Sequence, residues 1–152
     1  MVTGAAVSVL AVCAALIQPR TGRALDAGRL RADTGVTVGL LITGAGLACA
    51  MLPGLTGVLL AAVGIGIGTG MITPLAFATL AGSTPPERMG QTMGAAELGR
   101  ELGDAGGPLL VAGVAAAATR TAGYAVPAVL VAAAPAVLTR RYDRINDWQA
   151  TT

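Results

Sequence analysis

Five long runs that are poor in charged residues dominate this sequence of 152 residues and limit what it can fold into; four of them contain no charge, and the run at 86–118 is charged only as far as Asp104. Each run is close to the length of about 20 residues that a helix needs to cross about 30 Å of hydrocarbon. Only 12% of the residues are charged, about half of what is normal for soluble chains. We therefore expect an all-α, polytopic membrane bundle of about five transmembrane helices, at residues 2–18, 34–52, 57–81, 86–118 and 122–139.

A soluble bundle of five helices is the alternative, and the composition of the runs argues against it. Such a bundle needs polar residues at helical spacing on the outer face of each helix, and these runs have almost none. Residues 1–152 are therefore predicted to form a single transmembrane domain that ends in a cytoplasmic tail at 140–152. Because no positively charged segment precedes the first run, we expect that run to remain as a span and not as a cleaved signal peptide.

The arginines predict the orientation of the spans, because cytoplasmic loops of membrane proteins are enriched in basic residues. They gather in alternate connectors, as five crossings require. This places the first connector, the third connector and the tail in the cytoplasm of a bacterial cell, with a multi-pass chain in the plasma (inner) membrane. The arginines concerned are Arg20, Arg23, Arg29 and Arg31, then Arg88, then Arg140, Arg141 and Arg144.

Proline and glycine predict where the helices end and begin. Pro19 and Gly22 are expected to end the first helix. Ser83 or Thr84 before Pro85 is expected to cap the start of the fourth helix, because a hydroxyl followed by proline is a common helix opening.

The third run contains four glycines at alternate positions, which predicts close helix packing. Gly64 with Gly68, and Gly66 with Gly70, form two overlapping pairs of small residues four apart. We expect one nearly flat face on this helix. Pro74, four residues further on, is expected to bend it.

The fourth run contains a charged stripe, which we define as Glu97, Arg100, Glu101 and Asp104. Offsets of three, four and seven residues place these side chains on one side of a helix, so Arg100 is expected to pair with Glu97 or Asp104. Two interpretations are open. The stripe is either a solvated ion-pair face or a coupling or gating site, in which a carboxylate of Glu101 or Asp104 lines a water-filled path and exchanges a proton.

Several classes of function are disfavoured by the residues that are missing. There is no histidine and every basic residue is arginine, so histidine-based acid–base catalysis and lysine Schiff bases are absent. With no metal-binding cluster, nucleophile–base pair or cofactor loop, we predict no enzymatic activity, no metal and no cofactor. The net charge of +2 is too small to indicate binding to nucleic acid.

Two motifs resemble those of the major facilitator superfamily. One is similar to the cytoplasmic loop motif of that family and comprises Gly22, Asp26, Gly28 and Arg29. The other resembles the antiporter motif of its drug exporters and comprises Gly94, Gly103, Gly107 and Pro108. The segment from Pro85 to Gly90 is similar to the turn that precedes the same helix in the family.

The resemblance implies half of a larger fold, because the family has twelve helices in two halves that rock about a central substrate. The five spans resemble helices eight to twelve of a drug-efflux-type member, which we prefer because a short basic tail follows the last span, although helices two to six fit the same order of loops. By this resemblance the loop motif would form a cytoplasmic latch, and Gly103, Gly107 and Pro108 would shape a bent helix that limits leak.

The function implied by the family is secondary active transport, as proton-coupled efflux of small organic molecules. Its partners would be the lipid bilayer, the transported molecule, protons, and either the missing half of the transporter or a second copy. The alternative is a non-transporting membrane subunit, or an inert truncated remnant, that acts only through helix association.

Overall fold

The structure is a computed structural model that describes residues 2–117 and 123–135, and these residues form helices joined by short connections. No strand is present within these ranges, so the all-α prediction is confirmed. The helices are α1 (Val2–Asp26), α2 (Ala32–Cys49), α3 (Gly54–Ser83), the short 3-10 helix η1 (Pro86–Arg88) and α4 (Met89–Ala117), followed by a helix at Gly123–Pro135.

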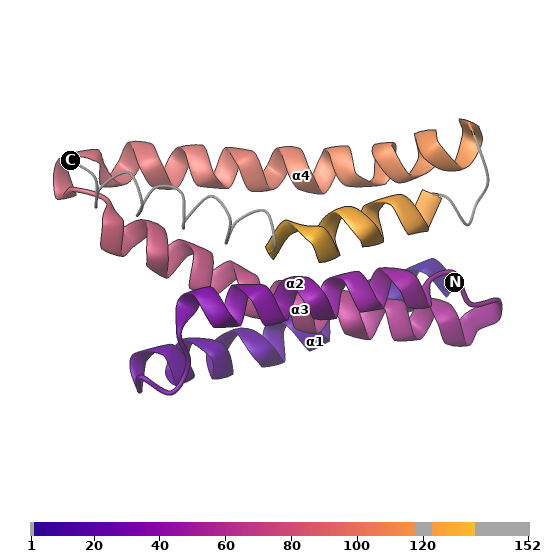
Figure 1. Cartoon of the computed structure of the whole chain (residues 1–152), viewed down its shortest axis with the longest axis horizontal. Coiled ribbons are helices and arrows are strands. Elements are labelled where there is room, and N and C mark those ends of the chain that lie inside the picture. Colours follow the sequence, from indigo (N-terminus) through magenta and orange to yellow (C-terminus); the bar gives the residue numbers. More distant parts are fainter. Residues whose placement is uncertain (1, 118–122, 136–152) are drawn as a thin grey trace, which may run out of the picture.

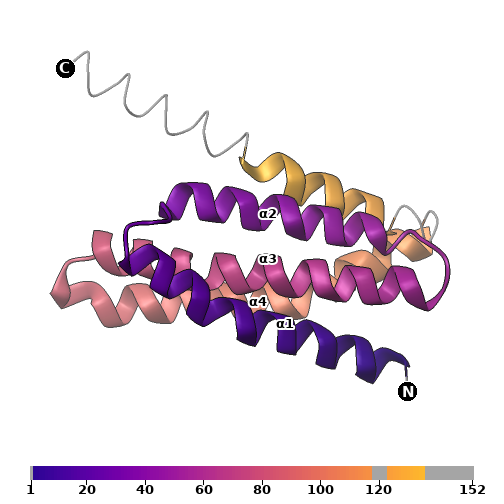
Figure 2. The same cartoon turned by 90° about the horizontal axis from the view of Figure 1, so that it is seen from below.

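The helices lie side by side and the chain reverses direction at each connection (Figures 1 and 2). The α1–α2 turn and the connection from α3 to α4 therefore lie at one end of the molecule, and the α2–α3 turn lies at the other. Helix α3 packs against both α1 and α2. The Gly123–Pro135 helix lies against α2, where a Cβ atom placed on Gly44 would be 3.3 Å from the Cβ of Ala132.

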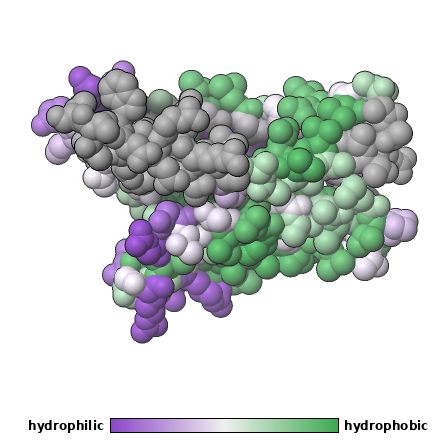
Figure 3. All heavy atoms as spheres, in the orientation of Figure 1, coloured by the Kyte–Doolittle hydropathy of each residue, from purple (hydrophilic) through white to green (hydrophobic). Residues whose placement is uncertain are grey.

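Three helices are long and apolar enough to cross a membrane: α1 from Gly4 onward, α2 and α3. Gly123–Pro135 is apolar but shorter. Helix α4 is one continuous helix over most of the predicted span at 86–118, but it is not among the three. The reason is that α4 contains the charged stripe. On the face that Figure 3 shows, the coloured surface is largely hydrophobic away from one end, and hydrophilic surface gathers at the end that holds the α1–α2 turn.

The four glycines of α3 pack against two different helices. They are Gly64, Gly66, Gly68 and Gly70. A Cβ atom on Gly64 would lie 2.8 Å from the Cα of Gly46 in α2, whereas one on Gly70 would lie 3.0 Å from the Cα of Ala14 in α1. The expectation of a single flat face was therefore wrong. Residues two apart on a helix point about 200° away from each other, so the two pairs face opposite neighbours.

Helix α2 provides a matching row of small residues that the sequence reasoning missed. A Cβ atom on Gly39 would lie 3.0 Å from the carbonyl oxygen of Gly68 in α3. Thr43 lies one turn further along and is buried, and its hydroxyl donates a hydrogen bond to the Gly39 carbonyl at 2.9 Å. The spacing Gly35, Gly39, Thr43 was visible in the sequence and indicates this packing face.

The predicted end of the first helix was wrong, because α1 continues past Pro19 to Asp26. Proline has no N–H to donate and its ring crowds the preceding turn. In this turn the guanidinium of Arg20 donates a hydrogen bond to the Leu16 carbonyl at 2.5 Å. The carbonyl that Pro19 deprives of a backbone donor is that of Ala15, and the Arg20 side chain bonds to the carbonyl of the next residue along the helix.

The α1–α2 turn begins at Ala27, and Gly22 lies inside α1. The amides of Arg29 and Leu30 both donate to the carbonyl oxygen of Ala24, at 2.9 and 3.1 Å, which closes the end of the helix. Gly28 has a φ of 65°, in the left-handed region that favours glycine. Gly22 and Gly28 could both adopt this conformation, and of the two only Gly28 does so.

The connection between α3 and α4 differs from the predicted cap. The hydroxyl of Ser83 donates to the Thr79 carbonyl at 2.9 Å, and the hydroxyl of Thr84 donates to the Leu80 carbonyl at 2.6 Å. Both side chains therefore close the end of α3. The residue that precedes η1 is Pro85, which makes no side-chain cap.

Alanine substitutions at Gly22 and Gly28 should have opposite effects on stability. A Cβ atom would have open space at either position, so only the backbone conformation differs. Gly22→Ala should raise the free energy of unfolding by about 0.5–1 kcal/mol, because alanine favours helix. Gly28→Ala should lower it by about 1–2 kcal/mol, because left-handed backbone is strained for alanine. Denaturant titration in mixed micelles, followed by circular dichroism, measures both changes, and equal signs would contradict the turn geometry.

Candidate functional site

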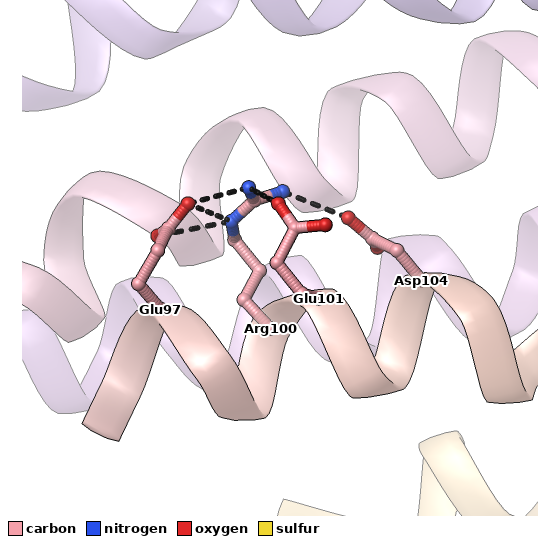
Figure 4. Close-up of polar contacts among 4 residues, drawn as sticks. All are labelled: Glu97, Arg100, Glu101 and Asp104. Carbon is pink, nitrogen blue, oxygen red and sulfur yellow. Dashed lines mark hydrogen bonds and ion pairs between the residues drawn. The ribbon is translucent and has the colours of Figure 1, made fainter. Parts of the chain in front are cut away.

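The charged stripe lies in the middle of α4, and the structure brings all four of its residues together (Figure 4). Their side chains project from the same side of the helix, as their spacing predicts. The α-helix starts at Met89, directly after the single turn of η1. Eight residues then separate this start from Glu97, so the stripe lies more than two helical turns inside α4.

Arg100 is the centre of the stripe and contacts every carboxylate in it. Its Nη2 atom lies 2.6 Å from Oε1 of Glu97 and 2.6 Å from Oε1 of Glu101. Its Nη1 atom donates to Oδ2 of Asp104 at 2.7 Å, one turn further along the helix. Its Nε atom lies 3.1 and 3.2 Å from the two oxygens of Glu97. One guanidinium therefore donates hydrogen bonds to three carboxylates. The four side chains of the stripe carry a net charge of −2.

The stripe is open to its surroundings. The side chain of Arg100 is 41% exposed and that of Asp104 is 66% exposed. Helix α4 contains no buried residue. Exposed ion pairs in water contribute only about 0–1 kcal/mol each, so these contacts are not needed to hold α4 in place. The arrangement instead presents carboxylate oxygens that water, a proton or a cationic group can reach.

The antiporter-like motif also lies on α4, and its glycines contact no neighbouring helix. A Cβ atom placed on Gly94, Gly103 or Gly107 would have no neighbour within 4 Å. Nine residues separate Gly94 from Gly103, which is about two and a half turns, so these two glycines lie on opposite sides of the helix. Pro108 lies inside the helix and leaves the carbonyl of Asp104 without its usual backbone donor. The backbone irregularity thus begins at the last residue of the charged stripe.

The loop motif is divided between two elements. Gly22 and Asp26 belong to α1, whereas Gly28 and Arg29 lie in the turn. Within the described residues, the ion pair of this region joins Arg31 to Asp33 at 3.2 Å and does not include Asp26. An aspartate at this place can cap a helix end or pair with an arginine, and Asp26 forms no ion pair with the described arginines.

The pair of Arg31 and Asp33 was missed by the sequence reasoning, although basic and acidic residues two apart at a helix start were visible. The hydrogen bond from Arg31 to the Asp33 carboxylate raises the pKa of the arginine above its ordinary value. Asp33 also accepts a hydrogen bond from the Thr34 amide at 2.8 Å. This exposed pair lies at the start of α2.

No metal site is visible in the part of the chain that the structure describes, since no three cysteine, aspartate or glutamate side chains are grouped to hold an ion. Cys13 and Cys49 are both free and partly buried.

Comparison with known proteins identifies the family of this chain. The sequence profile of the Major Facilitator Superfamily matches residues 1–151. Proteins from two strains of Mycobacterium tuberculosis, each called "Multidrug resistance protein B homolog", are 38% identical to this chain over 71 residues. That alignment covers 47% of this chain and 13% of each relative, so the chain spans a small part of their length. No solved structure matches it. Because the profile covers almost every residue, the chain belongs to the major facilitator superfamily.

Proposed function

We propose that this chain takes part in proton-coupled efflux of small organic molecules across a bacterial plasma membrane. Membership of a transporter family supports transport as the general function. The name of the two relatives, multidrug resistance protein B homolog, supports export of organic compounds. The relatives are much longer than the region they share with this chain, so the substrate site of the complete transporter would include helices beyond these.

The observation that carries the proposal is the contact of Arg100 with three carboxylates on α4. A proton that binds Asp104 or Glu101 would neutralise that carboxylate and break its ion pair, while Arg100 keeps its other partners. Release of the proton would restore the pair. In this proposal the stripe would alternate between two arrangements that differ by one proton, which is what coupling to a proton gradient requires.

The two family motifs take supporting roles in this proposal. Gly28 and Arg29 would act in a cytoplasmic latch between α1 and α2, together with Gly22 and Asp26. Gly103, Gly107 and Pro108 would let α4 bend next to the stripe. The α1–α2 turn and the connection to α4 would face the cytoplasm, because they lie at the same end of the molecule and five arginines, two in the last turns of α1 and three in these connections, gather there. The cytoplasmic tail at 140–152 lies outside the described residues.

Reconstitution in vesicles tests the proposal directly. The purified chain is inserted into proteoliposomes, a pH gradient is imposed, and uptake of a fluorescent organic cation is followed. We expect accumulation that depends on the gradient and stops when a proton ionophore dissipates it. Vesicles that contain folded protein but show no uptake in either direction of the gradient would contradict transport by this chain.

A second candidate function is helix association without transport, and the open surface of α4 favours it. All seven glycines of α4 have space for a Cβ atom, and Leu98, Leu102 and Leu109 are more than half exposed. A helix with such a surface is suited to pack against other membrane helices. The mass of the protein in detergent, measured by light scattering, separates the cases when combined with the uptake assay. A dimer that transports supports the first function, and an oligomer without uptake supports the second.

A further inference from the structure

The α1–α2 turn has more positive charge than its acidic neighbours neutralise. Residues 20–31 contain four arginines and one aspartate, a net charge of +3. Asp33 neutralises Arg31 through their ion pair. In the described residues the side chains of Arg23 and Arg29 form no ion pair, and both are exposed. Glu87 and Arg88, at the same end of the molecule, cancel each other in charge. The positive charge of Arg23 and Arg29 is therefore available to a partner.

The backbone holds these two arginines in a defined position. The amide of Ala27 donates to the Arg23 carbonyl at 3.0 Å, and the Arg29 amide donates to the Ala24 carbonyl at 2.9 Å. Leu30 is half-buried and packs against α2, where its Cδ2 atom would lie 3.1 Å from a Cβ atom placed on Gly35. Hydrogen bonds to the end of α1 and the packing of Leu30 against α2 thus hold the turn in one conformation. Little conformational freedom is therefore lost when the arginines bind a ligand.

The depth of the arginines in the membrane indicates the kind of ligand. Arg23 lies in the last turn of α1, which is apolar enough to span the bilayer from Gly4 to Asp26, and Arg29 follows six residues later, before α2 enters. Both positions therefore lie where lipid headgroups begin. The arginine guanidinium presents a planar set of donors that matches phosphate oxygens. Figure 3 shows that the surface changes at this end from hydrophobic to hydrophilic.

We propose that Arg23 and Arg29 form a binding site for the headgroup of an anionic phospholipid of the bilayer. Arg20 contributes at the edge of this site, because among the described residues its guanidinium makes one hydrogen bond, to the Leu16 carbonyl, and has further donors to offer. The site holds the α1–α2 turn at the membrane surface. It does not depend on whether the chain transports anything.

Native mass spectrometry of the full chain in detergent tests the site by titration with phosphatidylglycerol and, separately, with phosphatidylcholine. A basic residue near an anionic surface strengthens binding by about five-fold, so two arginines predict a preference of about twenty-five-fold for the first phosphatidylglycerol bound. The double variant Arg23→Gln with Arg29→Gln should lose this preference. A wild-type chain without preference, or a double variant that keeps it, would overturn the proposal.

A matched control removes the neighbouring ion pair without changing the net charge. Arg31→Gln combined with Asp33→Asn should keep the preference, because this pair is already neutral. The single variants Arg23→Gln and Arg29→Gln should each reduce the preference by about five-fold, which provides a test if the double variant does not fold.

Competition by excess inorganic phosphate distinguishes the source of the ligand. Displacement of the lipid by phosphate would overturn the assignment to a bilayer lipid.

Discussion

Asp104→Asn or Glu101→Gln should abolish uptake driven by a pH gradient and leave the helical fold unchanged. Each substitution keeps the size of the side chain and removes its ability to bind and release a proton. Both residues are exposed and contact only Arg100 among the ion pairs of the described residues, so neither change leaves a gap in a packed core. The measurement is uptake of the fluorescent cation in proteoliposomes, with circular dichroism as the measure of folding.

Asp33→Asn is the matched control for these variants. Asp33 is also an exposed aspartate paired with an arginine, but it lies at the start of α2, away from the stripe. Loss of the Asp33 carboxylate should change uptake by less than a factor of about two, since an exposed ion pair contributes little to stability. Normal uptake by Asp104→Asn and by Glu101→Gln would remove the stripe from the coupling mechanism and leave it as a solvated ion-pair face.

Gly66→Leu should disrupt the packing of α1 against α3 and have the largest effect on stability of any change considered. The Cβ atom alone would lie 2.9 Å from the Cβ of Cys13 and 3.1 Å from the Cα of Leu10. The backbone of α1 would have to move away, because a backbone atom cannot rotate aside as a side chain can. Overpacking of this kind typically costs about 1–3 kcal/mol, and we expect the upper end of that range. Denaturant titration in mixed micelles measures the loss.

Gly99→Leu is the control, because a Cβ atom at Gly99 in α4 would have no neighbour within 4 Å. This change adds the same side chain to a helix and should stabilise it slightly, since leucine favours helix over glycine by up to about 1 kcal/mol. If the two variants were equally stable, the close contact of α1 with α3 would not exist in the membrane.

The sequence was sufficient to predict the all-α class, the family and the approximate number of helices. These features follow from local properties that any folded arrangement must respect. An apolar run of about 20 residues has few stable alternatives to a helix in lipid. The contacts of Arg100 with Glu97 and Asp104 were predictable for the same reason, because helical spacing of three and four residues brings these side chains together, whereas the contact with the adjacent Glu101 was not predicted.

Helix ends were less predictable, because the signals at Pro19 and Ser83 each fit two outcomes. Proline ends a helix when its neighbours cannot satisfy the freed carbonyl, but α1 continues through Pro19 with Arg20 bonded to the backbone nearby. A serine beside a helix boundary can cap the next helix or close the previous one. Ser83 does the second, since its hydroxyl donates to the Thr79 carbonyl behind it.

What the sequence alone determined is therefore the set of helices, the charged stripe and the presence of close-packing glycines. What only the tertiary structure decided is which neighbour each glycine meets. Gly64 meets Gly46 in α2, and Gly66 meets Leu10 in α1, whereas Gly103 in α4 meets nothing within 4 Å. Spacing along one helix fixes the direction of a residue, but the partner in that direction is set by how separate helices assemble. That assembly depends on contacts between residues far apart in the sequence, so no local pattern contains it.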